Sequence, residues 1–150
     1  MFSNVLVICV GNICRSPMAE ALLRHRLGTP GMLIHSAGIN TVPGSAIDPL
    51  AKSVLQAHEV PVRRHEARQV NRQLLRQAQL ILLMERAHLL NILKLAPEVR
   101  GKTFLIGRWQ HKQEVADPYR SSRSAFEQAY EHLSRCVDDW LPYLQSGETR

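Results

Sequence analysis

The sequence predicts an α/β fold in which helices flank a parallel β-sheet in three layers. Two observations support this: four short apolar runs alternate with helical segments, and the first run leads through a glycine-containing loop into a helix. The 150 residues contain no repeat, low-complexity segment or linker, and this length is typical of one domain. We therefore expect a single domain over residues 1–150.

A strand and a helix are expected at the start of the chain. The segment Asn4–Cys9 is rich in branched apolar residues, which favours a buried strand. Residues 17–27 predict a helix, because Ser16 and Pro17 suit its N-cap and first turn and Gly28 suits its end. The apolar N-terminus lacks the cationic leader and the cleavage site of a signal peptide, so we expect it to belong to the fold.

The next elements continue the alternation of strands and helices. We expect a second strand at 32–35 and, after a loop, a helix that begins at Asp48-Pro49 and runs to about residue 58. Residues 71–78 predict a further short helix.

The second half of the chain supplies two more strands and two more helices. Apolar runs at 80–84 and 103–106 predict the third and fourth strands, and 85–95 predicts a helix between them. A long loop over 107–120 precedes the final helix at 121–144. Because parallel sheets bind ligands at the carboxyl ends of their strands, a site is expected in the loop after the first strand.

Composition restricts the classes of function. A formal charge of +6 favours acidic partners, but only 5% of residues are aromatic, which leaves few platforms for stacking nucleic-acid bases. The three cysteines do not form a disulfide framework of the secreted kind, and the seven histidines lack the spacing of a zinc site. No segment approaches the roughly 20 apolar residues that cross a bilayer. We expect a cytoplasmic protein that neither inserts into a membrane nor binds nucleic acid.

The loop after the first strand has the layout of a phosphate-binding loop. Phosphate needs donors without bulk, which backbone N–H groups of a tight loop at a helix N-terminus supply. Gly11 and Asn12 tolerate unusual backbone angles, and the planar Arg15 guanidinium can bind two phosphate oxygens at once. We predict that the phosphate-binding residues are Val10, Gly11, Asn12, Ile13, Cys14, Arg15 and Ser16.

Cys9 lies at the base of this loop and is the candidate nucleophile. Inward N–H dipoles and Arg15 favour its thiolate, which could attack a phosphoryl group and form a cysteinyl-phosphate, with Ser16 donating to the sulfur. The spacing alone also fits a buried cysteine at the end of a strand. The preceding strand and the Arg15-Ser16-Pro17 helix start favour the catalytic interpretation.

Departure of a tyrosyl or alkyl leaving group requires a proton donor, and Asp117 is the best candidate. It lies in the Asp117-Pro118-Tyr119 segment of a long loop that could fold over the phosphate. Asp-Pro is also common in plain turns, so the segment alone leaves both interpretations open. The same dipeptide at Asp48-Pro49 is better explained as a helix start.

These residues together resemble the low-molecular-weight protein tyrosine phosphatases over essentially the whole chain. The resemblance rests on residues 9–16, on Ser36-Ala37-Gly38 and on Asp117-Pro118-Tyr119. It is strongest for the bacterial members associated with exopolysaccharide or capsule export. The segments that resemble this subgroup are 5–20, 67–72, 84–85 and 97–102.

The resemblance implies a fold, a set of catalytic roles and the absence of a metal or cofactor. The sheet would have four strands in the order 2-1-3-4. Cys9 would be the nucleophile, Arg15 the clamp on the phosphate, and Asp117 the general acid and then the base for water.

The resemblance also implies a supporting network and a substrate pocket. Asn12 would hold the loop through Ser36 and His65, although a histidine between two charged neighbours otherwise suggests a solvated loop residue. The pocket would be formed by Val42, Tyr119 and Arg120. Val42 replaces an aromatic residue of the animal members, so the slot would be more open and its substrate preference different. Arg120 replaces a second tyrosine of those members, so regulation by phosphorylation at this position is not implied.

Two further features concern regulation and substrate choice. Cys14 either packs within the loop or, as the resemblance implies, forms a reversible disulfide with Cys9 that limits over-oxidation. Cys136, in the last helix, is expected in the core. Arg120 and Arg123 near the acid loop would steer acidic phosphotyrosine segments toward the site.

The predicted function is hydrolysis of phosphotyrosine by a monomeric protein. The resemblance implies that the substrate is an autophosphorylated, membrane-associated bacterial tyrosine kinase of exopolysaccharide or capsule synthesis and export. One alternative is a thioredoxin-coupled arsenate reductase of the same fold, which needs relay cysteines that residues 80–95 lack. Another is a non-catalytic phosphate- or nucleic-acid-binding module, which only the charge of +6 favours.

Overall fold

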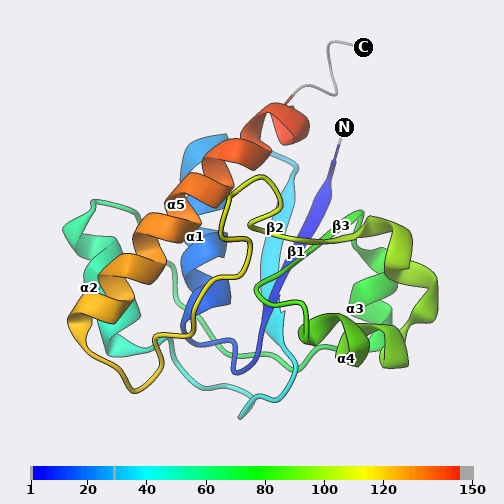
Figure 1. Cartoon of the computed structure of the whole chain (residues 1–150), viewed down its shortest axis with the longest axis horizontal. Helices are drawn as coiled ribbons and strands as arrows, with labels where there is room; N and C mark the ends of the chain where they lie inside the picture. The colour runs from blue at the N-terminus through cyan, green and yellow to red at the C-terminus, as the bar shows by residue number, and fades with distance from the viewer. Residues whose placement is uncertain (1, 29, 146–150) are drawn as a thin grey trace.

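A computed structural model describes residues 2–28 and 30–145 of the chain. Met1, Thr29 and residues 146–150 lie outside this description, and the prediction of one domain over 1–150 stays a prediction. The described residues form one four-stranded parallel sheet in the order β2-β1-β3-β4, with helices on both faces (Figure 1). This confirms the predicted α/β fold and its strand order.

β1 is a central strand, and its continuous apolar sequence is typical of that position. It pairs with β2 on one side and β3 on the other, so that Val5 lies opposite both Ile34 and Leu80. A strand with neighbours on both sides and helices on both faces has no solvated face, and a continuous apolar run is the result. The strands are β1 (Asn4–Cys9), β2 (Leu33–Gly38), β3 (Leu80–Leu83) and β4 (Thr103–Leu105).

The two faces of the sheet carry separate hydrophobic cores. Alternate residues of β1 point to opposite faces, so Val5 and Val7 join one core while Leu6 and Ile8 join the other. The first core is closed by α1 (Arg15–Leu27), α2 (Pro49–Ala57) and α5 (Arg123–Gln145), and the second by α3 (Arg72–Gln77) and α4 (His88–Leu95), as Figure 1 shows.

Local sequence signals fix three of the helix ends. The Asp48 carboxylate accepts from the Leu50 amide at the start of α2, and Asn71 accepts from the Leu74 amide at the start of α3. Gly28 ends α1 in the left-handed conformation, with φ of 52°. Among the described residues, no helix has both the length and the apolar character needed to cross a membrane.

Some predicted boundaries were wrong near the phosphate loop. α1 begins at Arg15, two residues before the predicted start, and its N-cap is Cys14 rather than Ser16. β2 continues to Gly38 instead of ending at residue 35, because its register with β1 extends as far as Cys9. Both differences bring additional residues into ordered structure directly beside the loop.

Other boundaries differ in the second half of the chain. Glu85 was predicted to start a helix, but α4 begins at His88, and the Glu85 side chain instead contacts Arg15. The final helix starts at Arg123, two residues late, and a 3₁₀ helix, η1 (Pro97–Lys102), was not predicted. Short 3₁₀ segments have no strong sequence period, which is why the pattern missed this one.

His35 of β2 is held in its neutral form. Its Nδ1 accepts from Arg68 Nη2 at 2.6 Å, while Nε2 donates to Asn4 Oδ1 at 2.7 Å. Burial, followed by the charges of Arg68 and Arg24, lowers its pKa from 6.5 to about 4. Between these values the unfolded chain binds a proton that the folded chain does not, so the free energy of unfolding decreases as the pH falls through this window.

We predict that His35→Gln, which keeps a donor and an acceptor, reduces the acid sensitivity of the fold. Urea unfolding at about pH 7 and about pH 4.5 should show a smaller loss of unfolding free energy in the variant than in the wild type. His25→Gln, which removes an exposed histidine, is the control and should behave as the wild type. An equal loss in His35→Gln and the wild type would contradict this account.

Candidate active site

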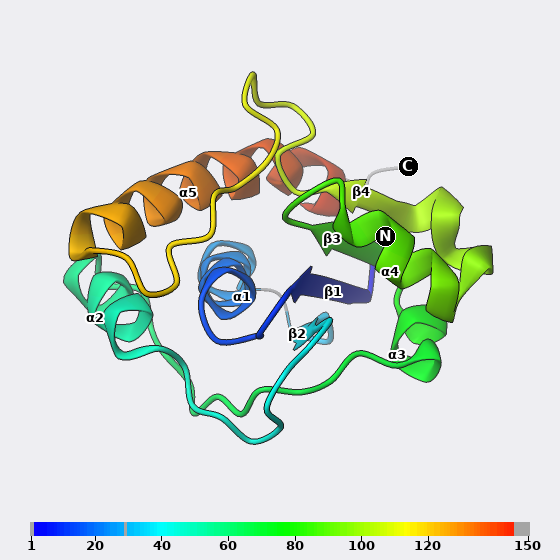
Figure 2. The ribbon, with the colours of Figure 1, turned by 60° about the horizontal axis from the view of Figure 1, so that its bottom comes forward.

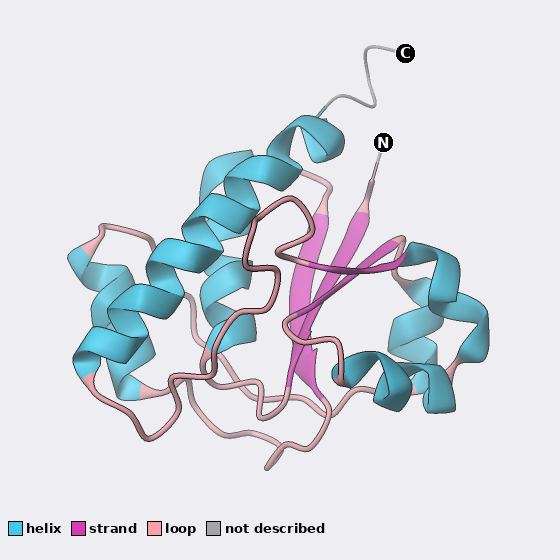
Figure 3. Cartoon of the chain, viewed as in Figure 1, coloured by secondary structure: helices cyan, strands magenta, loops and turns pink. Residues whose placement is uncertain are grey.

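The candidate site lies at the carboxyl end of the sheet, where the loops gather (Figures 2 and 3). The loop of residues 10–14 joins β1 to α1, and its carbonyl groups are held from outside. The Cys9, Val10 and Ile13 carbonyls accept from the amides of Ile39, Asn40 and Asp48 at 2.9–3.0 Å. The amides of residues 10–14 meet no acceptor within the described part of the chain, so they stay available to an anion.

Asn12 holds the loop in a strained conformation. Its φ of 57° is left-handed, which is unfavourable for a residue with a Cβ, and its side chain is fully buried. Nδ2 donates to the hydroxyls of Ser16 and Ser36 at 2.8 and 2.9 Å, and Oδ1 accepts from the Arg68 amide at 2.9 Å. The Asn12 carbonyl accepts from His65 Nε2 at 2.6 Å. The structure thus brings Asn12, Ser36 and His65 together.

Cys9 and Ser16 are in direct contact beneath the loop. Cys9 Sγ lies 2.9 Å from Ser16 Oγ, and both side chains are buried. Because Ser16 Oγ accepts from Asn12, its own hydrogen is free to point at the sulfur. This arrangement provides one hydrogen-bond donor for a thiolate at Cys9.

Arg15 is a buried cation whose guanidinium is fixed by hydrogen bonds to neighbouring segments. Its side chain is 1% exposed, and Nη1 donates to Glu85 Oε2 at 2.6 Å and to the Val115 carbonyl at 2.7 Å. Nη2 lies 3.6 Å from Asp117 Oδ2. A buried charge is costly unless it is paired and hydrogen-bonded, and these contacts supply both. They also fix the plane of the guanidinium and bring the Asp117 loop onto the phosphate loop.

The predicted pocket residues lie on an open rim. Tyr119 donates its amide hydrogen to Asp117 Oδ1 at 3.1 Å, and its side chain is half exposed. The Arg120 guanidinium lies 5.2 Å from the centre of the Tyr119 ring, and Val42 is exposed on the other loop. Arg123, by contrast, donates to Ser53 of α2 at 2.7 Å. Of the two arginines near the acid loop, Arg120 is therefore the one beside the rim.

The cysteines are all free in this structure. Cys14 is buried at the N-cap of α1, and burial, followed by the charges of Asp48 and Cys9, raises the pKa of its thiol well above the usual range. Cys136 lies in the core as predicted, and burial raises its pKa to about 12. Both thiols are therefore protonated at neutral pH.

The residues that hold Arg15 and Asn12 in place were not predicted from the sequence. Glu85 lies two residues after the end of β3, and a carboxylate near the carboxyl end of a buried parallel strand was a usable signal. His88 is buried next to it, with Nε2 3.6 Å from Glu85 Oε2, and burial lowers its pKa. No local pattern could have shown that the Arg68 backbone amide binds Asn12.

Comparison with known proteins decides the family. The model of the family "low molecular weight phosphotyrosine protein phosphatase" matches residues 4–149. The chain is 44% identical to the low molecular weight protein-tyrosine-phosphatase Wzb of Salmonella typhimurium over 148 residues, which is 99% of this chain and 98% of that protein. The chain belongs to the low-molecular-weight protein-tyrosine phosphatases.

Solved structures of members of this family superpose closely on this phosphatase. The tyrosine phosphatase AmsI of Erwinia amylovora gives a TM-score of 0.92 at 41% identity, covering 97% of this chain and 95% of that one. Wzb of Escherichia coli K30, solved in complex with sulphate, gives 0.91 at 41% identity, covering 96% and 99%. The predicted family and the predicted class of enzyme are confirmed, in preference to the reductase and the non-catalytic binding module.

Gly38 gives the phosphate loop the room it needs. A Cβ at this position would lie 2.5 Å from the Val10 carbonyl oxygen and 3.0 Å from the Asn12 amide nitrogen, both in the backbone of the loop. A backbone cannot move aside as the end of a flexible side chain can. The glycine at the end of β2 is therefore required by close packing.

We predict that Gly38→Ala displaces the loop and destabilises the fold by about 1–3 kcal/mol, the usual range for overpacking. Urea unfolding would measure the stability, and the inhibition constant of inorganic phosphate would measure the geometry of the loop and should increase. Gly101→Ala is the matched control, because a Cβ there meets nothing within 4 Å. Equal phosphate inhibition of both variants would refute the requirement for Gly38.

Proposed function

We propose that this phosphatase hydrolyses phosphotyrosyl proteins through a cysteinyl-phosphate on Cys9, within a single domain and without a metal or cofactor. The observation that supports the proposal most is the contact between two distant segments. Asp117 Oδ2 lies 3.6 Å from the Arg15 guanidinium, at the end of the loop whose base holds Cys9. A nucleophile, a phosphate clamp and an acid would then act on one phosphoryl group.

In the first step, the amides of residues 10–14 and the Arg15 fork bind the phosphoryl oxygens. Cys9 Sγ attacks phosphorus while the bond from phosphorus to the tyrosyl oxygen breaks. Asp117 in its acid form donates a proton to that oxygen, so that tyrosine leaves as the neutral phenol. Charge develops on the equatorial oxygens, where the preorganised donors are directed.

In the second step, water replaces the sulfur on phosphorus. The Asp117 carboxylate takes a proton from the water, the new P–O bond forms and the S–P bond breaks. Cys9 departs as a thiolate, which the Ser16 hydroxyl stabilises by donating its hydrogen across 2.9 Å. Release of inorganic phosphate restores the starting state.

The proposed substrate is an autophosphorylated, membrane-associated tyrosine kinase of exopolysaccharide or capsule synthesis and export. Support comes from the similarity to Wzb and from the open, basic rim, where Arg120 lies beside Tyr119. Val42 and Tyr119 would form the sides of the slot that receives the phosphotyrosine ring. The free thiols fit a reducing compartment, so we place the protein in the cytoplasm and propose that it acts as a monomer.

Cys14 is the proposed redox partner of Cys9. A peroxide would oxidise the Cys9 thiolate to a sulfenic acid, and the Cys14 sulfur would then displace hydroxide and form a disulfide. Since the pKa of the Cys14 thiol is raised by burial, the thiolate is scarce and disulfide formation should be slow at neutral pH.

We predict that Cys9→Ser abolishes hydrolysis of p-nitrophenyl phosphate. We also predict that Asp117→Asn lowers kcat by a factor that depends on the leaving group. Phenyl phosphate needs the proton most, so its kcat should fall by about 10²–10⁴-fold, while p-nitrophenyl phosphate should lose much less. Steady-state kinetics on both substrates would measure this.

Asp138→Asn is the control for the loss of a carboxylate, because Asp138 lies on α5 and pairs with Arg26. It should leave both rates near the wild-type values. Activity that survives Cys9→Ser would refute the cysteinyl-phosphate mechanism, and equal losses on both substrates in Asp117→Asn would remove Asp117 from the acid role.

A further inference from the structure

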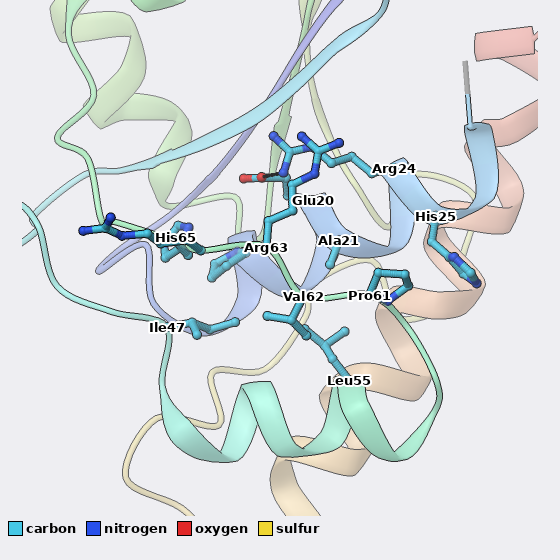
Figure 4. A pocket seen from close by; sticks show the side chains of 12 residues that line it. Glu20, Ala21, Arg24, His25, Ile47, Leu55, Pro61, Val62, Arg63 and His65 are labelled. Carbon is cyan, nitrogen blue, oxygen red and sulfur yellow. Dashed lines mark ion pairs between the residues drawn. The ribbon is translucent and has the colours of Figure 1, made fainter. Parts of the chain in front are cut away.

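A cavity of about 270 Å³ lies between α1, α2 and the segment 61–65. It does not include Cys9, Arg15 or Asp117, so it is separate from the candidate active site. Figure 4 shows that its side chains come from α1 on one side and from the segment 61–65 on the other, with Leu55 of α2 and Ile47 below. This cavity has an apolar part and a cationic part.

The apolar part is a floor of aliphatic side chains and proline rings. Ala21 lies on α1 and Leu55 on α2, and Val62 lies between them (Figure 4). Such a floor binds a flat hydrocarbon ring by excluding water from both surfaces. The floor residues are Pro17, Ala21, Ile47, Leu55, Pro61 and Val62.

The cationic part consists of two guanidinium groups beside one carboxylate. Arg24 forms an ion pair with Glu20, and Figure 4 shows the Arg63 side chain extending toward the Arg24 guanidinium. Burial lowers the pKa of Arg24, Glu20 opposes this, and the like charge of Arg63 adds to the lowering. Arg63 has no ion pair of its own within the described residues. One positive charge is therefore uncompensated at the cavity.

The Glu20 carboxylate is committed elsewhere and cannot neutralise both arginines. Besides Arg24, it accepts a hydrogen bond from Ser36 Oγ at 2.6 Å. Arg64 also lines the cavity but pairs with Glu66, so the excess positive charge at the cavity is that of Arg63. An anionic group could bridge Arg24 and Arg63, whereas a cationic ligand would be repelled.

We infer that this cavity is a second ligand site, which binds a small anion carrying an apolar ring, and that its occupancy is coupled to the phosphate loop. The volume of the cavity suits a ligand with a single ring or two fused rings and excludes a long acyl chain. A carboxylate, sulfonate or phosphate on the ring would supply the charge. The cavity takes no part in the reaction at Cys9, so ligand binding there does not depend on the proposed phosphatase activity.

The coupling runs through hydrogen bonds that share atoms with both sites. Glu20 accepts from Ser36, Ser36 accepts from Asn12, and Asn12 also donates to Ser16 beneath the loop. His65, which lines the cavity, donates to the Asn12 carbonyl. The cavity and the phosphate loop therefore rest on the same buried asparagine.

These hydrogen bonds predict that the coupling is positive, so that a ligand in the cavity increases the affinity of the loop for phosphate. A ligand anion that attracts Arg24 and Arg63 leaves Glu20 a stronger acceptor for the Ser36 hydroxyl, which in turn becomes a better acceptor for Asn12. The loop is then held more firmly in its binding conformation, and its affinity for phosphate rises. By linkage, phosphate increases the affinity of the cavity for its ligand by the same factor.

The test uses naphthalene-2-carboxylate as the probe. Calorimetric titration into the full-length protein is carried out with saturating inorganic phosphate, which occupies the loop and prevents the probe from binding there. We expect saturable binding to the wild type, weakened about tenfold or more in Arg63→Ala. Arg100→Ala removes another exposed positive charge, from η1, and should bind as the wild type does.

2-Naphthylmethylamine, with the same rings and the opposite charge, is the control ligand and should not bind. Absence of saturable binding to the wild type, or equal binding to Arg63→Ala and Arg100→Ala, would overturn the site. Ala21→Leu provides a second variant, because it fills the floor without changing any charge, and it should also weaken the probe.

A separate measurement tests the coupling. The dissociation constant of inorganic phosphate, determined calorimetrically, should decrease when the probe is saturating in the wild type and stay unchanged in Arg63→Ala. An unchanged constant in the wild type would overturn the coupling. Because this measurement records phosphate binding and no turnover, its outcome is independent of whether Cys9 performs the proposed chemistry.

Discussion

The left-handed backbone of Asn12 is the constraint on which the site depends. A loop that directs successive amides inward must turn sharply, and Asn12 makes that turn with φ of 57°. Strain of this kind persists only where the surroundings hold it, and here every polar atom of the buried side chain and the carbonyl has a partner. The partners come from three separate parts of the chain, so the loop is as well defined as the fold around it.

Other features follow from this requirement. β2 must run on to Gly38 because Ser36 has to reach Asn12, and Gly38 must lack a Cβ because the loop passes directly over it. The segment that carries His65 and Arg68 packs beside the same loop and extends the sheet by one bridge, between Gly38 and Gln69. Arg15 is held independently by Glu85 and Val115, which connects β3 and the acid loop to α1.

Much of the fold could be predicted from periodicity and end signals, because the strands are continuous apolar runs and Asp48, Asn71 and Gly28 mark helix ends. Strand order came only from the resemblance, since a local pattern carries no information about which strands pair. The Cys9–Ser16 loop was recognisable because its chemistry lies within eight consecutive residues. Long-range contacts, such as that of Arg15 with Glu85, depend on how β3 ends, and no local sequence rule specifies this.

The central claim is that the Asn12 side chain holds the phosphate loop in its binding conformation. The affinity of the loop for inorganic phosphate measures this most directly. Calorimetric titration of inorganic phosphate into Asn12→Ala would be compared with Asn71→Ala, which removes an asparagine from the start of α3, far along the chain from the loop. We predict that Asn12→Ala binds phosphate at least about tenfold more weakly, while Asn71→Ala binds as the wild type does. Wild-type phosphate affinity in folded Asn12→Ala would contradict the claim that this side chain holds the loop.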